Sequence, residues 1–121
     1  DVAVDASGRY AASASHDGTV RLWDLQTGQG RLLLDVSPQA ARSLTFSPDG
    51  RTLLVGLAKG ASDAPDYALR LIDIASGEEL RHFAGHSAVV ADVAFSPDGK
   101  LALSGSVDKS LILWDVSSGQ V

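Results

Sequence analysis

The stretch that decides the fold is Gly85–Asp115, GHSAVVADVAFSPDGKLALSGSVDKSLILWD. It begins with Gly-His, ends with Trp-Asp and contains one strong turn signal, the SPDG sequence at residues 96–99. Pro, Asp and Gly in this order favour a tight turn, because Pro presets the backbone and Gly accepts a positive φ. The apolar runs on both sides of the turn are typical of β-strands. The stretch therefore predicts a small set of antiparallel strands.

The same unit occurs three times along the chain. The turns end at Gly8, Gly50 and Gly99, and the closing pairs are Trp23-Asp24, Ile72-Asp73 and Trp114-Asp115. The distance from turn glycine to closing pair is 15 residues in the first and third copies and 22 in the second, which therefore holds 7 extra residues. A further 27 residues lead from each closing pair to the next turn glycine, so the base period is 42 residues.

A period of about 40–45 residues that starts with Gly-His and ends with Trp-Asp is typical of propeller blades. On these motifs the chain resembles the WD40-repeat β-propellers over essentially its whole length, most closely in the third copy and least in the second. The FSPDG repeats and Ser-Gly-Gln turns look bacterial. The resemblance implies an all-β fold of four-stranded antiparallel blades, in a three-blade arc whose last outer strand is missing. Blade 1 is expected at about residues 1–36, blade 2 at about 37–85 and the incomplete blade 3 at about 86–121.

Three blades cannot close a ring by themselves, because propellers typically have four to eight. An open arc would expose an apolar blade face at each end, and such faces favour association. We expect the chain to be a segment of a longer propeller, whose remaining blades cover these faces. The alternative partner is a second copy of the chain, since head-to-tail contacts between copies can close a ring.

The composition of the chain argues against several kinds of site and partner. The chain has 121 residues, a net charge of −5 and no cysteine, which excludes a disulfide framework and a cysteine-based metal site. The chain has no Lys/Arg cluster, which argues against nucleic acid or an anionic membrane as partner. The absence of cysteine suits a reducing cytoplasm, and we expect a cytoplasmic protein without a cofactor or metal. No segment approaches the roughly 20 apolar residues that span a bilayer.

The resemblance also implies a structural hydrogen-bond tetrad in each blade. It comprises the His of Gly-His, a Ser on the second strand, the Asp of the next turn and the Trp of the third strand, which in the third copy are His86, Ser104, Asp108 and Trp114. The first copy keeps Ser13, Asp17 and Trp23, whereas the second has Ser37, Val55 and Ile72 at the His, Ser and Trp positions. The second blade is therefore expected to rely on apolar packing.

A Ser, His and Asp set also suggests a hydrolase, which we regard as the least favoured function. A catalytic serine needs an exposed hydroxyl and an oxyanion hole, and Ser104 lies within an expected strand instead of a nucleophile elbow. His82 and His86 are four residues apart, as in helical metal sites, but their segment is predicted as strand and turn. We therefore expect neither an enzyme nor a metal site.

Binding is expected on one rim of the propeller. The outer-to-inner loops and the turns between second and third strands emerge on the same rim, here named the top rim, and the extra residues of the second copy form a loop there at 58–66. The candidate contacts for a protein or peptide partner are His16, Lys59, Asp63, Asp66, Tyr67, Ser87 and Val107. Longer loops often contribute to binding, although surface loops also accept neutral insertions at little cost.

These features predict a non-catalytic protein–protein interaction scaffold. Two alternatives remain. One is a sensor or regulatory propeller of a multidomain signalling protein, such as a kinase or a signalling ATPase, because bacterial WD40 propellers are often attached to such enzymes. The other is a propeller that assembles from several copies of the chain.

Overall fold

The structure is a computed structural model that describes residues 1–59 and 66–121, and the described residues form three antiparallel sheets. The first sheet contains β1 (Val2–Val4), β2 (Tyr10–Ala14), β3 (Thr19–Asp24) and β4 (Gly30–Asp35). The second contains β5 (Ala40–Phe46), β6 (Thr52–Ala58), β7 (Leu69–Asp73) and β8 (Glu79–Phe83). The third contains β9 (Val90–Phe95), β10 (Leu101–Ser106) and β11 (Leu111–Asp115). In each sheet the strands follow in chain order, as in successive hairpins. This all-β architecture agrees with the sequence prediction.

The repeated turns have the chemistry that the sequence indicates. Gly50 and Gly99 adopt φ values of 72°, which a residue with a side chain rarely tolerates. In the turn before β6, the Ser47 hydroxyl donates to Asp49 at 2.6 Å, and the Ser96 hydroxyl donates to Asp98 at 2.6 Å in the turn before β10. These local bonds fix the reversal between inner and second strands, so the register of each hairpin is set within a few residues.

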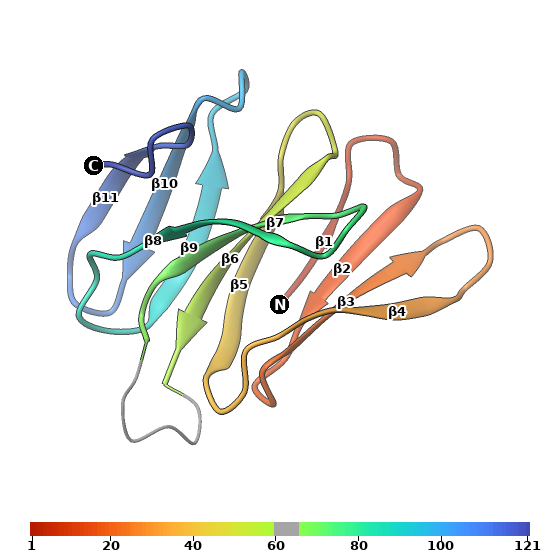
Figure 1. The fold of residues 1–121 in the computed structure, drawn as a ribbon, viewed down its shortest axis with the longest axis horizontal. Helices are drawn as coiled ribbons and strands as arrows, with labels where there is room; N and C mark the ends of the chain where they lie inside the picture. The colour runs from red at the N-terminus through yellow and green to blue at the C-terminus, as the bar shows by residue number, and fades with distance from the viewer. Residues whose placement is uncertain (60–65) are drawn as a thin grey trace.

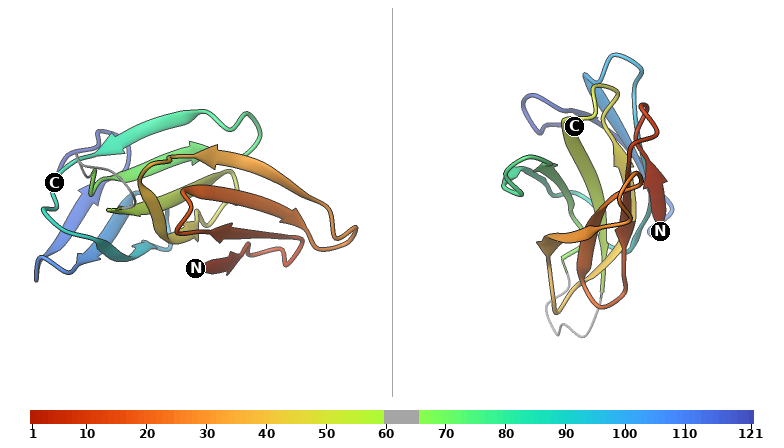
Figure 2. Two further views of the ribbon diagram at one scale, coloured as in Figure 1. Left: turned by 90° about the horizontal axis from the view of Figure 1, so that it is seen from below. Right: turned by 90° about the vertical axis from the view of Figure 1, so that its right-hand side faces the viewer.

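The three sheets follow one another as blades of an open arc (Figure 1). The inner strands β1, β5 and β9 neighbour one another, and β5 contacts both of the others. Figure 2 shows the outer strands β4 and β8 on the side of the molecule opposite to β1 and β9. We call the sheets blades 1, 2 and 3 in chain order.

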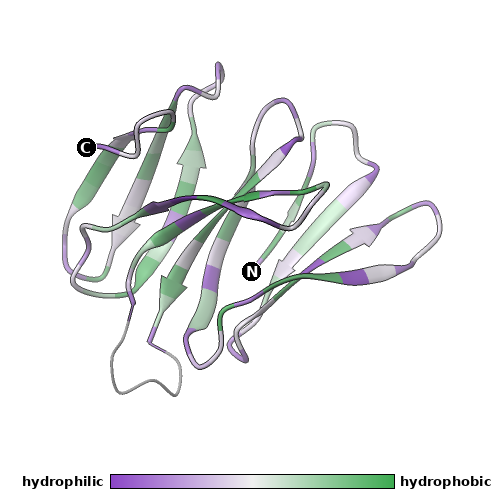
Figure 3. Ribbon diagram, viewed as in Figure 1, coloured by the Kyte–Doolittle hydropathy of each residue, from purple (hydrophilic) through white to green (hydrophobic). Residues whose placement is uncertain are grey.

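Two separate apolar cores lie between the blades. The core between blades 1 and 2 includes Ala12, Val20 and Leu22 on the first sheet and Leu44, Leu53, Val55 and Ile72 on the second. The core between blades 2 and 3 includes Leu54, Leu69, Leu71, Phe83, Val93, Ala102 and Trp114. Blade 2 contributes to both cores, so β6 and β7 are apolar on both faces, and Figure 3 shows apolar residues along these two strands. Val55 and Ile72, at the tetrad positions of blade 2, are fully buried.

The face of blade 3 that points away from blade 2 is apolar but uncovered. Leu103 and Leu111 on this face are 42% and 73% exposed. Their counterparts one repeat earlier, Leu54 and Leu69, are fully buried beneath blade 3. The difference arises from the neighbour and not from the residue type, because all four are leucines.

The described part of the chain contains no helix that is long and apolar enough to cross a membrane.

Equivalent leucines should therefore differ in their contribution to stability. We expect Leu54→Ala to lower the free energy of unfolding by about 2–5 kcal/mol, because it removes a buried side chain and leaves a cavity. Leu103→Ala should cost about 1 kcal/mol or less in the same chain, since Leu103 is 42% exposed and no blade covers it. Urea unfolding followed by circular dichroism measures both values, and equal losses would contradict the open face.

Candidate functional site: the buried tetrad and the two rims

Blade 3 contains a continuous hydrogen-bond chain of four side chains. The Trp114 indole Nε1 lies 2.8 Å from the Ser104 hydroxyl, which lies 2.7 Å from His86 Nε2. His86 Nδ1 lies 2.9 Å from an Asp108 carboxylate oxygen. These four residues come from β10, β11, the turn between them and the connection from β8 to β9. The chain therefore links both hairpin strands of the blade to the segment that enters it.

The donors in this chain follow from the chemistry of its two ends. Trp114 is only a donor and the Asp108 carboxylate only an acceptor, which fixes the direction of the two terminal bonds. The indole N–H donates to Ser104 and His86 Nδ1–H donates to Asp108, while the Ser104 hydroxyl and His86 Nε2 share the hydrogen bond between them. Every polar atom along the chain is then satisfied, as burial requires.

Two further serines complete the site: Ser110, which was not expected from the sequence, and Ser87, which was expected only as a contact for a partner. The hydroxyl of Ser110 donates to Asp108 and lies 3.1 Å from His86 Nδ1, while the Ser110 backbone N–H donates to Asp108 at 2.8 Å. The backbone N–H of Ser87 donates to Asp108 at 3.0 Å. A signal for Ser110 was present, because Asp followed two residues later by Ser is typical of a local side-chain turn.

These donors act on the charge of Asp108. The hydroxyl of Ser110, the backbone N–H groups of Ser87 and Ser110 and the imidazole of His86 hold the pKa of the Asp108 carboxyl well below its usual range. Hydrogen bonds to the charged form favour that form. The carboxylate is therefore ionised at neutral pH and fixes the orientation of the imidazole.

The same geometry excludes a serine hydrolase at this site. Ser104, His86 and Asp108 have the spacing of a catalytic triad, but Ser104 is fully buried and its oxygen already accepts the indole N–H of Trp114. A nucleophile must reach its substrate, and a base must be free to take the proton. The arrangement can orient and stabilise strands, which is a structural role.

Blade 1 has a shorter version of this site. Trp23 Nε1 donates to the Ser13 hydroxyl at 3.0 Å. Asp17 bonds to the backbone N–H and the hydroxyl of Thr19, at 2.9 and 2.7 Å, as Asp108 does with Ser110. Trp23 is 37% exposed, whereas Trp114 packs edge-on against Phe83 and is 1% exposed. The indole of blade 1 is therefore bonded but not covered.

The residues proposed as partner contacts belong to three different blades along the top rim, which is the lower edge in Figure 1. His16, Lys59, Ser87 and Val107 are exposed, and Tyr67 is half-buried. Asp63 lies outside the described residues. The structure brings two of these positions close together in blade 3, where Val107 N–H donates to the Val89 carbonyl near Ser87. It does not gather the others into one cluster.

Asp66 belongs to an ion-pair network that the sequence did not indicate. Its carboxylate lies 2.9 Å from Arg70 and 3.3 Å from His82, and Arg70 also lies 2.8 Å from Glu79. Partial burial raises the pKa of Asp66, but the bonds from Arg70 and His82 outweigh it and hold this pKa below its ordinary value. The charge of Asp66 is thus already paired within blade 2. His82 and His86 serve separate networks, and the described residues include no group of three or more side chains placed to hold a metal ion.

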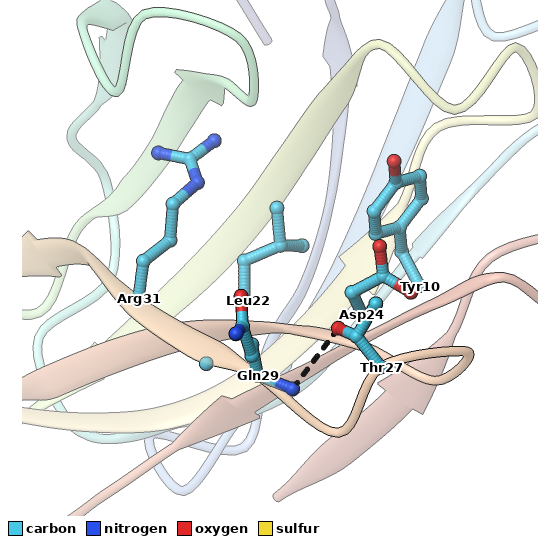
Figure 4. Close-up of a pocket in the computed structure, with 7 residues that line it drawn as sticks. Tyr10, Leu22, Asp24, Thr27, Gln29 and Arg31 are labelled. Carbon is cyan, nitrogen blue, oxygen red and sulfur yellow. Dashed lines mark hydrogen bonds between the residues drawn. The ribbon is translucent and has the colours of Figure 1, made fainter.

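The opposite rim, here named the bottom rim, has a groove between blades 1 and 2. One cavity of about 290 Å³ is lined by Tyr10, Leu22, Asp24, Thr27, Gln29, Gly30 and Arg31. An adjoining cavity of about 510 Å³ shares Tyr10, Leu22 and Arg31 and adds Gly50, Arg51, Asp73, Ile74 and Ala75. Figure 4 shows Tyr10, Leu22 and Arg31 projecting to the same side of blade 1. The sequence analysis considered the top rim and missed this groove.

Antiparallel sheets of three or four strands placed side by side, the third with a polar chain from His to Trp, are consistent with β-propeller blades. The family model described as "WD domain, G-beta repeat" matches residues 1–24 and 77–115, which is just over half of the chain. The chain therefore belongs to the WD40 repeat family. The matched residues cover most of the first and third copies, where the motifs are also most complete. WD40 domains generally serve in protein interaction and are not catalytic.

Curated relatives agree with this assignment. WD repeat-containing protein SL1-17 of Schistosoma mansoni is 29% identical over 99% of this chain and 51% of its own length. Human WD repeat and SOCS box-containing protein 1 is 32% identical over 87% of this chain and 24% of its length. Nuclear distribution protein PAC1 of Coccidioides posadasii is 32% identical over 90% of this chain and 26% of its own length. The chain thus spans about half or less of the length of these relatives. All three are eukaryotic, so the expected bacterial character is not supported.

The buried tetrad predicts unequal effects of removing the same hydroxyl in two blades. We expect Ser104→Ala to cost about 1–3 kcal/mol in unfolding free energy, because it leaves the buried indole N–H of Trp114 and an imidazole nitrogen without partners. The matched variant Ser13→Ala should cost less than about 1 kcal/mol, since water reaches the half-exposed Trp23. Urea midpoints of both variants check this difference, and a larger loss for Ser13→Ala would contradict it.

The lowered pKa of Asp108 predicts a pH dependence. A carboxyl whose pKa is lower in the folded state stabilises the fold above its ordinary pKa near 3.8, and this stabilisation is lost as the pH falls towards the folded value. We therefore expect Asp108→Asn to destabilise the chain more at about pH 7 than at about pH 3. Asp17→Asn is the comparison: bonds from the Thr19 hydroxyl and backbone N–H also lower the pKa of Asp17, so we expect a pH-dependent loss of the same sign but smaller. Urea unfolding at both pH values gives the result, and a pH-independent loss for Asp108→Asn would contradict it.

Proposed function

We propose that this chain is a non-catalytic protein-interaction scaffold whose three blades form part of a larger WD40 ring. The observation that carries the proposal is the apolar face of blade 3, which is uncovered although the same face is buried in blades 1 and 2. The exposed residues of the top rim, His16, Lys59, Ser87 and Val107, would offer contacts to a protein or peptide partner. A sensor role in a multidomain signalling protein is a narrower form of the same proposal.

Asp92 supports a further blade on this face. At the equivalent position in blade 1, Asp1 accepts the N–H of Val2 at 2.9 Å and, through its other oxygen, the N–H of Leu44 in blade 2 at 3.1 Å. Asp92 repeats the first bond, accepting the N–H of Val93 at 2.9 Å. Among the described residues its other oxygen has no recorded donor. A backbone N–H at the Leu44 position of a following blade would supply one.

The opposite end of the arc has a matching face. Val2 and Val4 in β1 are 75% and 59% exposed, whereas Leu44 and Phe46, their counterparts in blade 2, are buried against blade 1. A preceding blade would cover Val2 and Val4 in the same way. Because the two uncovered faces are counterparts of an interface already present between blades, a second copy of the chain could also supply the missing blades. This self-assembly is the second candidate.

The mass of the chain in solution tests both forms of the proposal. We expect sedimentation equilibrium to give either a single chain whose uncovered faces bind the apolar dye bis-ANS, or a closed multiple of chains. In both cases we expect Leu111→Asp on the open face to have an effect. It should reduce dye binding by the single chain, or dissociate the closed assembly of several chains. Leu25→Asp is the control, because Leu25 is exposed in a turn outside the blade faces.

The two results distinguish the source of the missing blades. A single chain with dye binding indicates blades in another polypeptide segment, and a multiple indicates copies of this chain. A folded single chain that binds no dye and is unaffected by Leu111→Asp would overturn the proposal, because its face would then need no cover.

A further inference from the structure

The groove on the bottom rim between blades 1 and 2 combines an apolar base with two cations. Leu22 is buried at its base, and Tyr10 is half-buried beside it. Among the described residues the Tyr10 hydroxyl has no recorded hydrogen-bond partner. Arg31 and Arg51 are exposed and line the same cavity from blade 1 and blade 2. Arg31 donates to the carbonyl of Ile74 across the blades, which holds its guanidinium over the groove.

The charges around the groove are unevenly paired. Its two carboxylates are engaged locally: Asp24 accepts the N–H of Gln26 at 2.9 Å and lies 3.5 Å from Arg9, and Asp73 accepts both the N–H and the hydroxyl of Ser76. Arg31 and Arg51 form no salt bridge with a described carboxylate. Their positive charges are therefore available to an incoming anion, although the chain as a whole is acidic.

The corresponding groove between blades 2 and 3 has different chemistry. Its lining residues are Ser47, Pro48, Asp49, Thr52, Leu71, Phe95, Asp98, Gly99 and Val116. Thr52 stands there in the place of Tyr10. Arg81 pairs with Leu71 as Arg31 pairs with Leu22, and it donates to the Ser118 carbonyl of blade 3, but it does not line this cavity. No arginine or lysine lines this cavity, although Lys100 occupies the sequence position of Arg51. A tyrosine and two arginines thus line only one of these two cavities.

We propose that the groove between blades 1 and 2 binds an extended acidic peptide segment, with a bulky apolar side chain on Tyr10 and Leu22 and carboxylates at Arg31 and Arg51. The inference rests on the protein-interaction function proposed above and names a site and a ligand class for it. A tyrosine and an arginine beside a buried apolar base are the residue types that dominate binding energy in protein interfaces. Arginine also pairs well with a carboxylate because its planar head donates two parallel hydrogen bonds.

The test uses a fluorescein-labelled ten-residue peptide with two Glu residues flanking a Trp in a Gly/Ser background, measured by fluorescence anisotropy. We expect the protein to bind this peptide and to bind the Lys-for-Glu peptide at least about tenfold more weakly. Raising the salt concentration from about 0.05 M to about 0.5 M should weaken binding, because the contacts are exposed ion pairs.

The variant Tyr10→Thr with Arg31→Leu removes the aromatic ring and one of the two lining cations from this groove. We expect it to lose at least about tenfold in affinity, whereas Thr52→Ala with Asp98→Asn in the other groove should change affinity less than about twofold. Because Arg31 also bridges the blades, Arg51→Glu provides a second test that removes no recorded hydrogen bond between blades. Unfolding midpoints of all variants show whether the fold is retained.

Three results would overturn the inference: equal affinity for the Glu and Lys peptides, unchanged binding by Arg51→Glu and the double variant, or no binding by the wild-type chain. None of these results would affect the ring proposal, which depends on mass and dye binding. If the chain failed the mass test but bound the acidic peptide through Arg31 and Arg51, the groove proposal would stand and the ring proposal would be overturned.

Discussion

The structure depends on one packing constraint: each blade is a sheet with two apolar faces, and only a neighbouring blade can bury them. Burial of apolar surface contributes about 25 cal/mol per Å², so an uncovered face is a large loss of stabilisation for a small domain. Blade 2 satisfies the constraint on both faces, and Val55 and Ile72 at its tetrad positions are fully buried. Blades 1 and 3 satisfy it on one face only.

The polar tetrad of blade 3 depends on the same packing. A hydrogen-bond chain from Trp114 to Asp108 adds much to the stability of the fold only where water is excluded, since water otherwise forms hydrogen bonds with each group. Phe83 of blade 2 covers the indole edge-on, with ring centroids 5.6 Å apart. In blade 1 the corresponding Trp23 has no such cover among the described residues. Interblade packing therefore decides how much each tetrad contributes to stability.

The sequence predicted the strands and the turns, because these depend on local spacing and on turn chemistry, whereas the tetrad of blade 3 was expected only from the resemblance to WD40 proteins. It did not predict the different exposure of Trp23 and Trp114, which have the same local motif but different neighbours. It also missed the groove at Tyr10, Arg31 and Arg51, because these residues come from three separate segments. The pairing of Asp66 with Arg70 and His82 was missed for a similar reason, since β8 begins well after the 58–66 loop.

The sharing of blade 2 between two cores has a mechanical consequence. A force applied to the two termini would act first on blades 1 and 3, each of which is held by a single core. Detaching blade 1 or blade 3 would expose one face of blade 2, while the core on its other face still held blade 2 in place. The chain would then extend in discrete steps, with β6 and β7 as the last strands to separate, and the order of the first two steps would report the relative strength of the two cores.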